Sequence, residues 1–223
     1  MKVAVLASGG KDSTYASWWA LMQGWSLEVM ITVKITGEDS MMFQLQNTEI
    51  AKFQAESIGV EWIEVKSSGI ENDEIYELED KIRKIEGSLD AIVVGALRSD
   101  YQKTRIERMC ERLGLISFCP LWHHNPSEHM NSLIEHGFDV RIVSVSSEGL
   151  GEKWLGKKIT KDSLDELTIL SEKFRFNLDG EGGEFETITL DAPHFKKTII
   201  CEGKKSWNGV RGVWDLTKIQ LSP

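Results

Sequence analysis

The stretch KVAVLASGGKDS, residues 2–13, decides how this chain folds. Its first half is a short apolar run of strand length, and the polar, glycine-rich SGGKDS follows directly. A helical pattern then runs from Ser13 to Gln23. A strand that leads through a glycine-rich turn into a helix directs several backbone N–H groups and the positive end of the helix dipole at one point. We therefore expect an anion-binding loop at residues 8–13.

The residue types in this loop suit a nucleotide phosphate. Its two glycines carry no Cβ that would block phosphate oxygens, and its two serine hydroxyls are neutral donors. Lys11 supplies a positive charge, and Asp12 is a candidate ligand for a Mg²⁺ ion that bridges phosphate oxygens. Neither G-x-x-x-x-G-K-[ST] nor G-x-G-x-x-G is present. The residues predicted to bind the nucleotide here are Ser8, Gly9, Gly10, Lys11, Asp12 and Ser13; the alternative is a turn in which Ser or Asp only caps the helix.

Short β-branched runs alternate with longer helical patterns through the first half of the chain, which is typical of a parallel sheet with crossover helices. We expect strands at 3–7, 27–35, 61–65, 91–95 and 115–118, and helices at 13–23, 45–58, 73–85 and 101–113. The sequence therefore predicts an α/β, Rossmann-like parallel sheet with helices on both of its faces.

The pattern changes after Trp122, where HHNPSE predicts a turn or linker. We place a boundary there, with a nucleotide-binding domain at 1–123 and a smaller α+β domain at 124–223. Helices are expected at 130–134 and at 162–174, the second capped by Asp162 or Ser163. A strand is expected at 140–145, and TITL, KKTIICEG, KKSWNG and RGVWDLTKIQL predict antiparallel strands.

Composition excludes several classes of function. The net charge of −9 over 223 residues argues against free nucleic acid as a partner. Apolar stretches such as VAVLAS are too short to cross a bilayer, and no signal-peptide core is visible, so we expect a cytoplasmic protein without a membrane helix. The three cysteines are an odd number with no C-x-x-C pair, which disfavours disulfides and zinc sites.

At SGGKDS the chain resembles the N-type ATP pyrophosphatases, the PP-loop superfamily, over roughly its first half. This resemblance implies a HUP-type (adenine nucleotide alpha hydrolase-like) fold, ATP and Mg²⁺ as cofactors, and catalytic roles for Lys11 and Asp12. Members adenylate a carboxyl or carbonyl group, which makes AMP the leaving group, and release pyrophosphate. A loop that binds the β- and γ-phosphates would also stabilise the charge on the departing pyrophosphate.

Two longer segments point to one family within this superfamily. GALRSDYQKTRIERMCERLGL at 95–115, followed by PLW at 120–122, and GEGGEFETITLDAP at 180–193 are similar to the archaeal and eukaryotic diphthine–ammonia ligases. Those enzymes amidate a modified histidine on translation elongation factor 2. The resemblance implies that factor as protein substrate and ammonium as nitrogen source, since no glutamine amidotransferase domain is visible.

The first of these segments supplies further candidates for nucleotide binding. Gly95 is expected to end a buried strand at the carboxyl edge of the sheet, where ligands of doubly wound folds bind. Ser99 and Asp100 are predicted to cap the next helix, and Gln102 and Lys103 lie in its first turn, able to face phosphates. The alternative for such residues is a capped, salt-bridged surface helix.

The second segment supplies candidates for the acceptor side. Repulsion among its three carboxylates disfavours burial without a cation, and both the trimethylammonio group of the acceptor and ammonium are cationic. We expect substrate binding by Glu181, Gly182, Gly183, Glu184, Phe185, Glu186 and Thr187, with Glu184 and Glu186 catalytic. A carboxylate here could deprotonate ammonium, and Phe185 could supply a cation–π face. The alternative is a solvated acidic turn.

The histidines lack the spacing of metal ligands. We expect surface or capping roles for His123, His124, His129 and His136, and for His194 a role only in shaping its turn.

Two other functions stay open. A tRNA-modifying PP-loop enzyme, of the thiolase or lysidine synthetase type, predicts a basic surface and often paired cysteines, unlike this chain. A non-catalytic ATP or AMP sensor predicts binding without turnover. A homo-oligomer is possible, and the sequence does not define its size.

Overall fold

The computed structural model describes residues 1–36, 47–70, 73–85 and 87–223. Its first half contains β1 (Lys2–Leu6), α1 (Lys11–Met22), β2 (Ser26–Ile35), α2 (Ile50–Ile58), β3 (Glu61–Ser67), α3 (Asp73–Arg83), β4 (Ala91–Val93), α4 (Asp100–Leu113) and β5 (Ile116–Phe118). The strands pair in parallel in the order β3-β2-β1-β4-β5. Because the strand order reverses between β1 and β4, the loops that follow these two strands border the crevice where such folds bind ligands.

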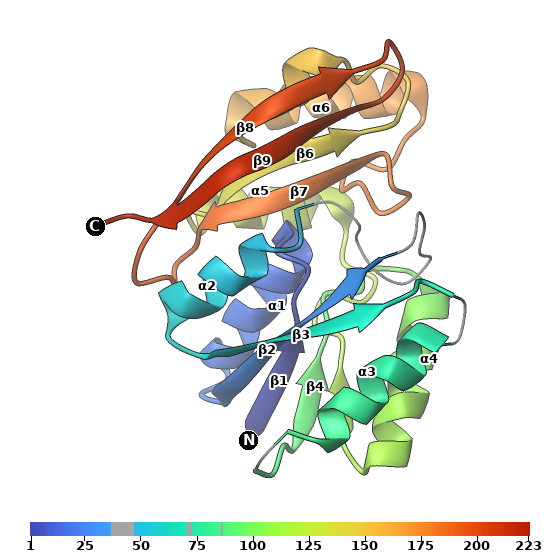
Figure 1. Cartoon of the computed structure of the whole chain (residues 1–223). Helices are drawn as coiled ribbons and strands as arrows, with labels where there is room; N and C mark the ends of the chain where they lie inside the picture. The colour runs from blue at the N-terminus through green and yellow to red at the C-terminus, as the bar shows by residue number, and fades with distance from the viewer. Residues whose placement is uncertain (37–46, 71–72, 86) are drawn as a thin grey trace.

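Helices cover both faces of this sheet, as predicted. α1 and α2 pack on the face that carries Val3, Val5 and Met30, and α3 and α4 pack on the face that carries Ala4 and Ile31. Successive residues of β1 thus point to opposite faces, and both faces are apolar because both are covered. This arrangement confirms the Rossmann-like α/β prediction (Figure 1).

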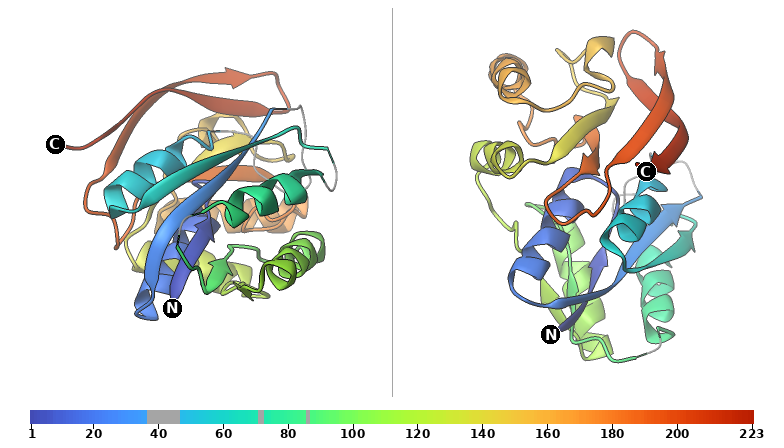
Figure 2. Two further views of the ribbon diagram at one scale, coloured as in Figure 1. Left: turned by 60° about the horizontal axis from the view of Figure 1, so that its bottom comes forward. Right: turned by 90° about the vertical axis from the view of Figure 1, so that its left-hand side faces the viewer.

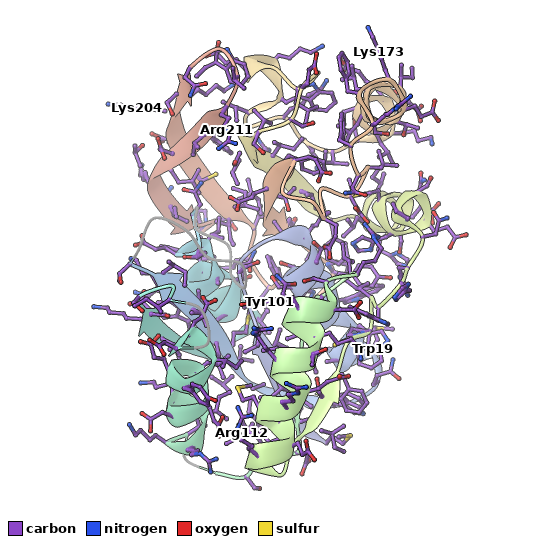
Figure 3. The ribbon with its side chains drawn as sticks, turned by 90° about the vertical axis from the view of Figure 1, so that its right-hand side faces the viewer. Trp19, Tyr101, Arg112, Lys173, Lys204 and Arg211 are labelled. Atoms are coloured by element: carbon purple, nitrogen blue, oxygen red, sulfur yellow. The ribbon has the colours of Figure 1, made fainter. Side chains whose placement is uncertain are left out.

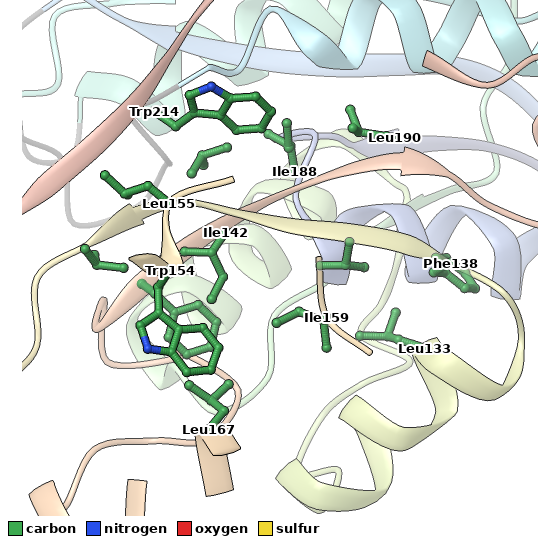
Figure 4. Packing of buried hydrophobic residues seen from close by; sticks show 14 of the residues in the cluster. Leu133, Phe138, Ile142, Trp154, Leu155, Ile159, Leu167, Ile188, Leu190 and Trp214 are labelled. Carbon is green, nitrogen blue, oxygen red and sulfur yellow. The ribbon is translucent and has the colours of Figure 1, made fainter. Parts of the chain in front are cut away.

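The second half contains a separate antiparallel sheet with helices on one side. Its elements are α5 (Pro126–Glu135), β6 (Asp139–Val145), a 3₁₀ turn (Glu152–Trp154), α6 (Lys161–Phe174), β7 (Phe185–Asp191), β8 (Ile199–Trp207) and β9 (Gly212–Leu221). The strand order is β7-β6-β9-β8. Trp154, Ile142 and Leu167 lie in the core between this sheet and α5 and α6 (Figure 4).

The two halves share a packed interface. α1 and α2 lie between the two sheets and contact β7, β8 and β9 (Figures 1 and 2). Ile50 of α2 is fully buried in the core of the second half, and Tyr15 and Trp18 of α1 pack against that core. The loop at residues 8–13, which is predicted to bind a nucleotide and is called the nucleotide loop below, therefore lies beside the second sheet.

Several expectations about the bounds and number of elements were wrong. α6 is capped by Thr160, not by Asp162 or Ser163. Ser163 occupies the third helical position, where its hydroxyl oxygen accepts a hydrogen bond from the backbone N–H of Thr160. The helix expected at 45–58 begins at Ile50, and Leu45 lies outside the described residues. KKTIICEG and KKSWNG form one strand, β8, because a register shift at Glu202 and Gly203 lets the pairing with β9 continue past the glycine.

Charged side chains cover the outer surface. Lys173 on α6, and Lys204 and Arg211 on the β8–β9 hairpin, point outward (Figure 3).

The longest of the described helices, α4 and α6, have 14 residues each. Among the described residues, none of the helices has the length and apolarity to span a bilayer.

Candidate functional site

The loop between β1 and α1 has the geometry of a phosphate-binding turn. Gly9 has φ of +86°, a left-handed conformation, and a Cβ at this position would collide with the Cγ2 atom of Ile50. Gly10 is the N-cap of α1 and has an ordinary φ of −78°. The serine hydroxyls bond within the loop: Ser8 accepts from the N–H of Gly10, and Ser13 donates to the carbonyl of Gly10. The loop is thus ordered by its own side chains, with Gly9 required by both conformation and space.

β7 of the second sheet holds this loop from the other side. The N–H of Lys11 donates to the Thr187 hydroxyl at 3.2 Å, and the N–H of Thr189 donates to the carbonyl of Gly9 at 3.0 Å. Gln54 of α2 completes the contact, since its amide nitrogen donates to the carbonyls of both Gly9 and Thr189. On the free edge of β7, the N–H and the carbonyl of Thr189 therefore bond to Gly9 of the nucleotide loop and to Gln54, instead of to another strand.

Lys11 and Asp12 form a charged pair in which Lys11 is buried and Asp12 is partly exposed to the cavity. Lys11 Nζ lies 2.8 Å from Asp12 Oδ2, and the side chain of Lys11 is only 5% exposed. The other Asp12 oxygen, Oδ1, lies 2.7 Å from Nε2 of His129 on α5. Burial alone would raise the pKa of Asp12, but the Lys11 charge and His129 outweigh it and lower that pKa below its ordinary value. Asp12 is thus held as a carboxylate.

His129 corrects a prediction. It is 2% exposed, instead of lying on the surface, and its ring stacks edge-on against Tyr15 with the centroids 5.3 Å apart. Its second nitrogen, Nδ1, is buried without a hydrogen-bond partner among the described residues. The sequence offered only weak evidence that His129 is buried. Met130 and Leu133 define the apolar face of α5, and His129 is next to Met130 in the sequence. His123, His124 and His136 are exposed, as expected.

His194 also does more than shape its turn. Its Nε2 lies 2.9 Å from the hydroxyl of Ser17 on α1, and burial lowers its pKa to about 4. The neutral ring therefore links the turn after β7 to the helix that follows the nucleotide loop.

The loop after β4 forms the second wall of the site. β4 ends at Val93, so Gly95 lies beyond the strand instead of ending it. A Cβ on Gly95 would lie 2.7 Å from the carbonyl oxygen of Asp12, so its bare backbone packs against the first turn of α1. Ser99 is the N-cap of α4 and accepts from the N–H of Gln102, as expected, while Asp100 is exposed in the first helical turn.

An ion pair joins this loop to the acidic segment of the second half. Arg98 Nη2 donates to Asp179 Oδ1 at 2.7 Å, and the Asp179 side chain is 1% exposed. The N–H of Arg98 donates to Glu181 Oε1 at 3.0 Å, and the N–H of Glu181 bonds to Asp179. The sequence did not predict a role for Arg98 or Asp179. Their ion pair forms between two loops that are distant in the sequence and meet only in the folded chain.

The acidic segment divides into residues with different surroundings. Glu181 faces the nucleotide loop, and burial, offset by the bond from the Arg98 N–H, raises its pKa. Glu184 Oε1 accepts from the backbone and the side chain of Asn177, which places this carboxylate within its own turn. Burial raises the pKa of Glu186 to about 7, with no charged neighbour contributing. Phe185 is buried in the core of the second half.

These loops enclose a cavity of about 210 Å³ at the carboxyl ends of β1 and β4. One part of its wall is apolar, formed by Leu6, Ala7, Ile31, Val33, Val94 and Ile106. The other part is polar, formed by Ser8, Asp12, Ser13, Gln102, Lys103 and Glu181, and Gly95 also lines it. An apolar wall beside a phosphate-binding loop suits a nucleotide, whose base is apolar and whose phosphates are charged. Gly182, Gly183, Glu184 and Glu186 are not part of the wall.

The sequence matches one family along almost its whole length. The family model for the diphthamide synthase N-terminal domain matches residues 1–117, and that for the C-terminal domain matches residues 125–221. The human protein named diphthine–ammonia ligase is 33% identical over 92% of this chain and 84% of its own length. Its namesake from Schizosaccharomyces pombe is 33% identical over 92% of this chain, which spans only 37% of that protein's length.

A solved structure described as a predicted subunit of a tRNA methyltransferase from Methanocaldococcus jannaschii covers 86% of this chain and 98% of that chain. Its identity of 17% and TM-score of 0.46 do not distinguish one function from another. By contrast, the two domain models and the human relative all point to diphthamide synthesis. The chain belongs to the diphthamide synthase family.

Proposed function

We propose that this chain is a diphthine–ammonia ligase that converts diphthine on translation elongation factor 2 to diphthamide, using ammonium and ATP and releasing AMP and pyrophosphate. The observation that carries the proposal is the cavity between the SGGKDS loop and Glu181, because it combines a phosphate-binding turn with a carboxylate from the family's second domain. The curated relatives that match 92% of the chain bear the same name.

The residues around the cavity fit ATP with Mg²⁺. The loop from Ser8 to Ser13 and the N-terminus of α1 would hold the phosphates, and the apolar wall would take the adenosine. Asp12 is the candidate metal ligand. Within the described ranges no three acidic, histidine or cysteine side chains gather as a metal site, so a Mg²⁺ ion at Asp12 would take its other ligands from phosphates and water. Such an ion would neutralise phosphate charge.

The same geometry suggests a division of labour. Lys11 and Asp12 would act on ATP, with Gly95, Ser99, Gln102 and Lys103 supporting the nucleotide site and Asp100 at the helix start. Of the segment from Glu181 to Thr187, Glu181 would face the acceptor from the cavity wall, whereas Phe185 is buried in the core and would not. Thr187 belongs to both groups, because it bonds to the N–H of Lys11. A cytoplasmic location and a homo-oligomeric state stay predictions.

The experiment is to incubate the protein with radiolabelled ATP, Mg²⁺, ammonium and diphthine-bearing elongation factor 2. AMP is separated from ADP, and the factor is weighed by mass spectrometry. AMP together with the mass change of amidation is the expected result. AMP formed only with another acceptor, such as a tRNA, would retain PP-loop chemistry and exclude this substrate. ATP bound without cleavage would indicate a sensor.

A further inference from the structure

Only one glutamate of the acidic segment lies where chemistry on an activated acceptor would occur. Glu181 forms part of the nucleotide cavity wall, whereas Glu184 is bound within its turn by Asn177, and neither Glu184 nor Glu186 lines the cavity. We propose that Glu181 is the carboxylate that binds ammonium and removes its proton. This inference rests on the proposed function and deepens it by assigning the ammonium site.

The two carboxylates of the cavity wall differ in what they can still bind. Each oxygen of Asp12 already has one partner, Lys11 at Oδ2 and His129 at Oδ1, which leaves Asp12 only its remaining lone pairs for a Mg²⁺ ion. Glu181 uses only Oε1, which accepts from the N–H of Arg98. Within the described part of the chain, the hydrogen bonds of Glu181 use its Oε1 and its backbone N–H, and none of them uses Oε2. Glu181 therefore retains an acceptor for a cation beside the nucleotide loop.

The position of Glu181 is fixed from two sides. Its backbone N–H bonds to the buried carboxylate of Asp179, and Asp179 pairs with the Arg98 guanidinium. The Glu181 carboxylate is thus oriented by two loops from different halves of the chain. A base that is held in place needs no rearrangement before it accepts a proton.

The surroundings also suit proton removal. Glu181 is partly buried, and burial raises its pKa while the Arg98 N–H opposes the rise and Asp12 adds to it. Of the carboxylates in the cavity wall it is therefore the better base, since the pKa of Asp12 is lowered. The elevated pKa of Glu186 does not alter this choice, because Glu186 lies outside the wall.

Ammonium transfers one proton to Glu181 Oε2, which leaves a lone pair on nitrogen. That pair attacks the acyl carbon of the adenylated acceptor, the C–N bond forms, the C–O bond to AMP breaks, and AMP leaves with the bonding electrons. The surplus proton on the new amide nitrogen passes to water, and Glu181 then returns its own proton to water.

The test uses Glu181→Gln, which keeps Oε1 as an acceptor for Arg98 and removes only the charge. Adenylation is measured as acceptor-dependent exchange of labelled pyrophosphate into ATP, and amidation is measured with ammonium and, separately, with hydroxylamine. Hydroxylamine is largely unprotonated at neutral pH and needs no base to free its lone pair. We expect exchange and hydroxamate formation within about twofold of the wild type, and kcat/KM for ammonium lower by about 10²- to 10⁴-fold.

Matched variants make the outcome decisive. Glu148→Gln removes an exposed carboxylate from the neighbouring loop and should leave all three rates unchanged. An unchanged ammonium kcat/KM in Glu181→Gln would overturn the inference, as would an equal loss of exchange. A selective ammonium defect in Glu184→Gln or Glu186→Gln in place of Glu181→Gln would also overturn it. Absence of amidation by the wild-type chain would instead overturn the proposed function, and the inference with it.

Discussion

Replacing His129 by alanine removes the hydrogen bond between α5 and Asp12 of the nucleotide loop. Nε2 of His129 lies 2.7 Å from Asp12 Oδ1, and the His129 side chain is 1% exposed. A hydrogen bond to a charged group contributes about 1.5–3 kcal/mol. Because about 1.36 kcal/mol corresponds to a factor of ten in rate, kcat/KM for Mg²⁺-ATP should fall about 10- to 150-fold. The fall reflects an Asp12 carboxylate that is no longer held in place.

The assay is pyrophosphate release at several ATP concentrations, after thermal unfolding has shown that each variant is folded at the assay temperature. His129→Gln is the informative partner variant, because a glutamine amide places an N–H near the position of Nε2 and should restore much of the lost kcat/KM. His123→Asn changes an exposed histidine in the segment before α5 whose ring lies against Trp122, and it should match the wild type. Wild-type kcat/KM in His129→Ala, or equal impairment of the alanine and glutamine variants, would refute the reasoning.

Three further predictions concern the frame of the site. Gly95→Ala places a Cβ 2.7 Å from the Asp12 carbonyl oxygen, so the free energy of unfolding should fall by about 1–3 kcal/mol and ATP should bind more weakly, as read by urea unfolding and calorimetry. Gly151→Ala, which meets open space, is its control, and equal effects would contradict the packing argument. Thr187→Val leaves the buried N–H of Lys11 without its acceptor, so KM for ATP should rise by about five- to tenfold, for a cost of about 1 kcal/mol or more. Thr217→Val, at an exposed position on β9, should leave that KM unchanged. Finally, burial raises the pKa of Glu186 from 4.5 to about 7, so the folded state binds this proton more tightly than the unfolded state. Stability from Glu186 is therefore complete below the unfolded pKa and is lost as the pH rises through about 7. Urea unfolding across that range should show a smaller decline in Glu186→Gln than in the wild type, and parallel profiles would contradict the burial of this carboxylate.

The local parts of the site follow from the sequence. A strand, two glycines, a lysine and a helix start are adjacent along the chain, so SGGKDS predicts a phosphate-binding turn without knowledge of the rest of the molecule. The α/β fold follows for the same reason, because strand and helix periodicities are properties of short segments. Ser99 as the cap of α4 was likewise predictable, since its partner Gln102 is only three residues away.

The contacts that select particular residues were decided by tertiary structure. His129 and Asp12 are 117 residues apart, and Lys11 and Thr187 are 176 residues apart. Sequence periodicity carries no information on such pairs, so His129 was predicted on the surface, and Glu184 and Glu186 were predicted to be catalytic although only Glu181 of the three glutamates lines the cavity. Packing of β7 against the nucleotide loop places Glu181 in the cavity wall and leaves Glu184 and Glu186 outside it. Residue type therefore predicts the chemistry available to this chain, whereas burial and the meeting of distant loops determine which side chains can perform it.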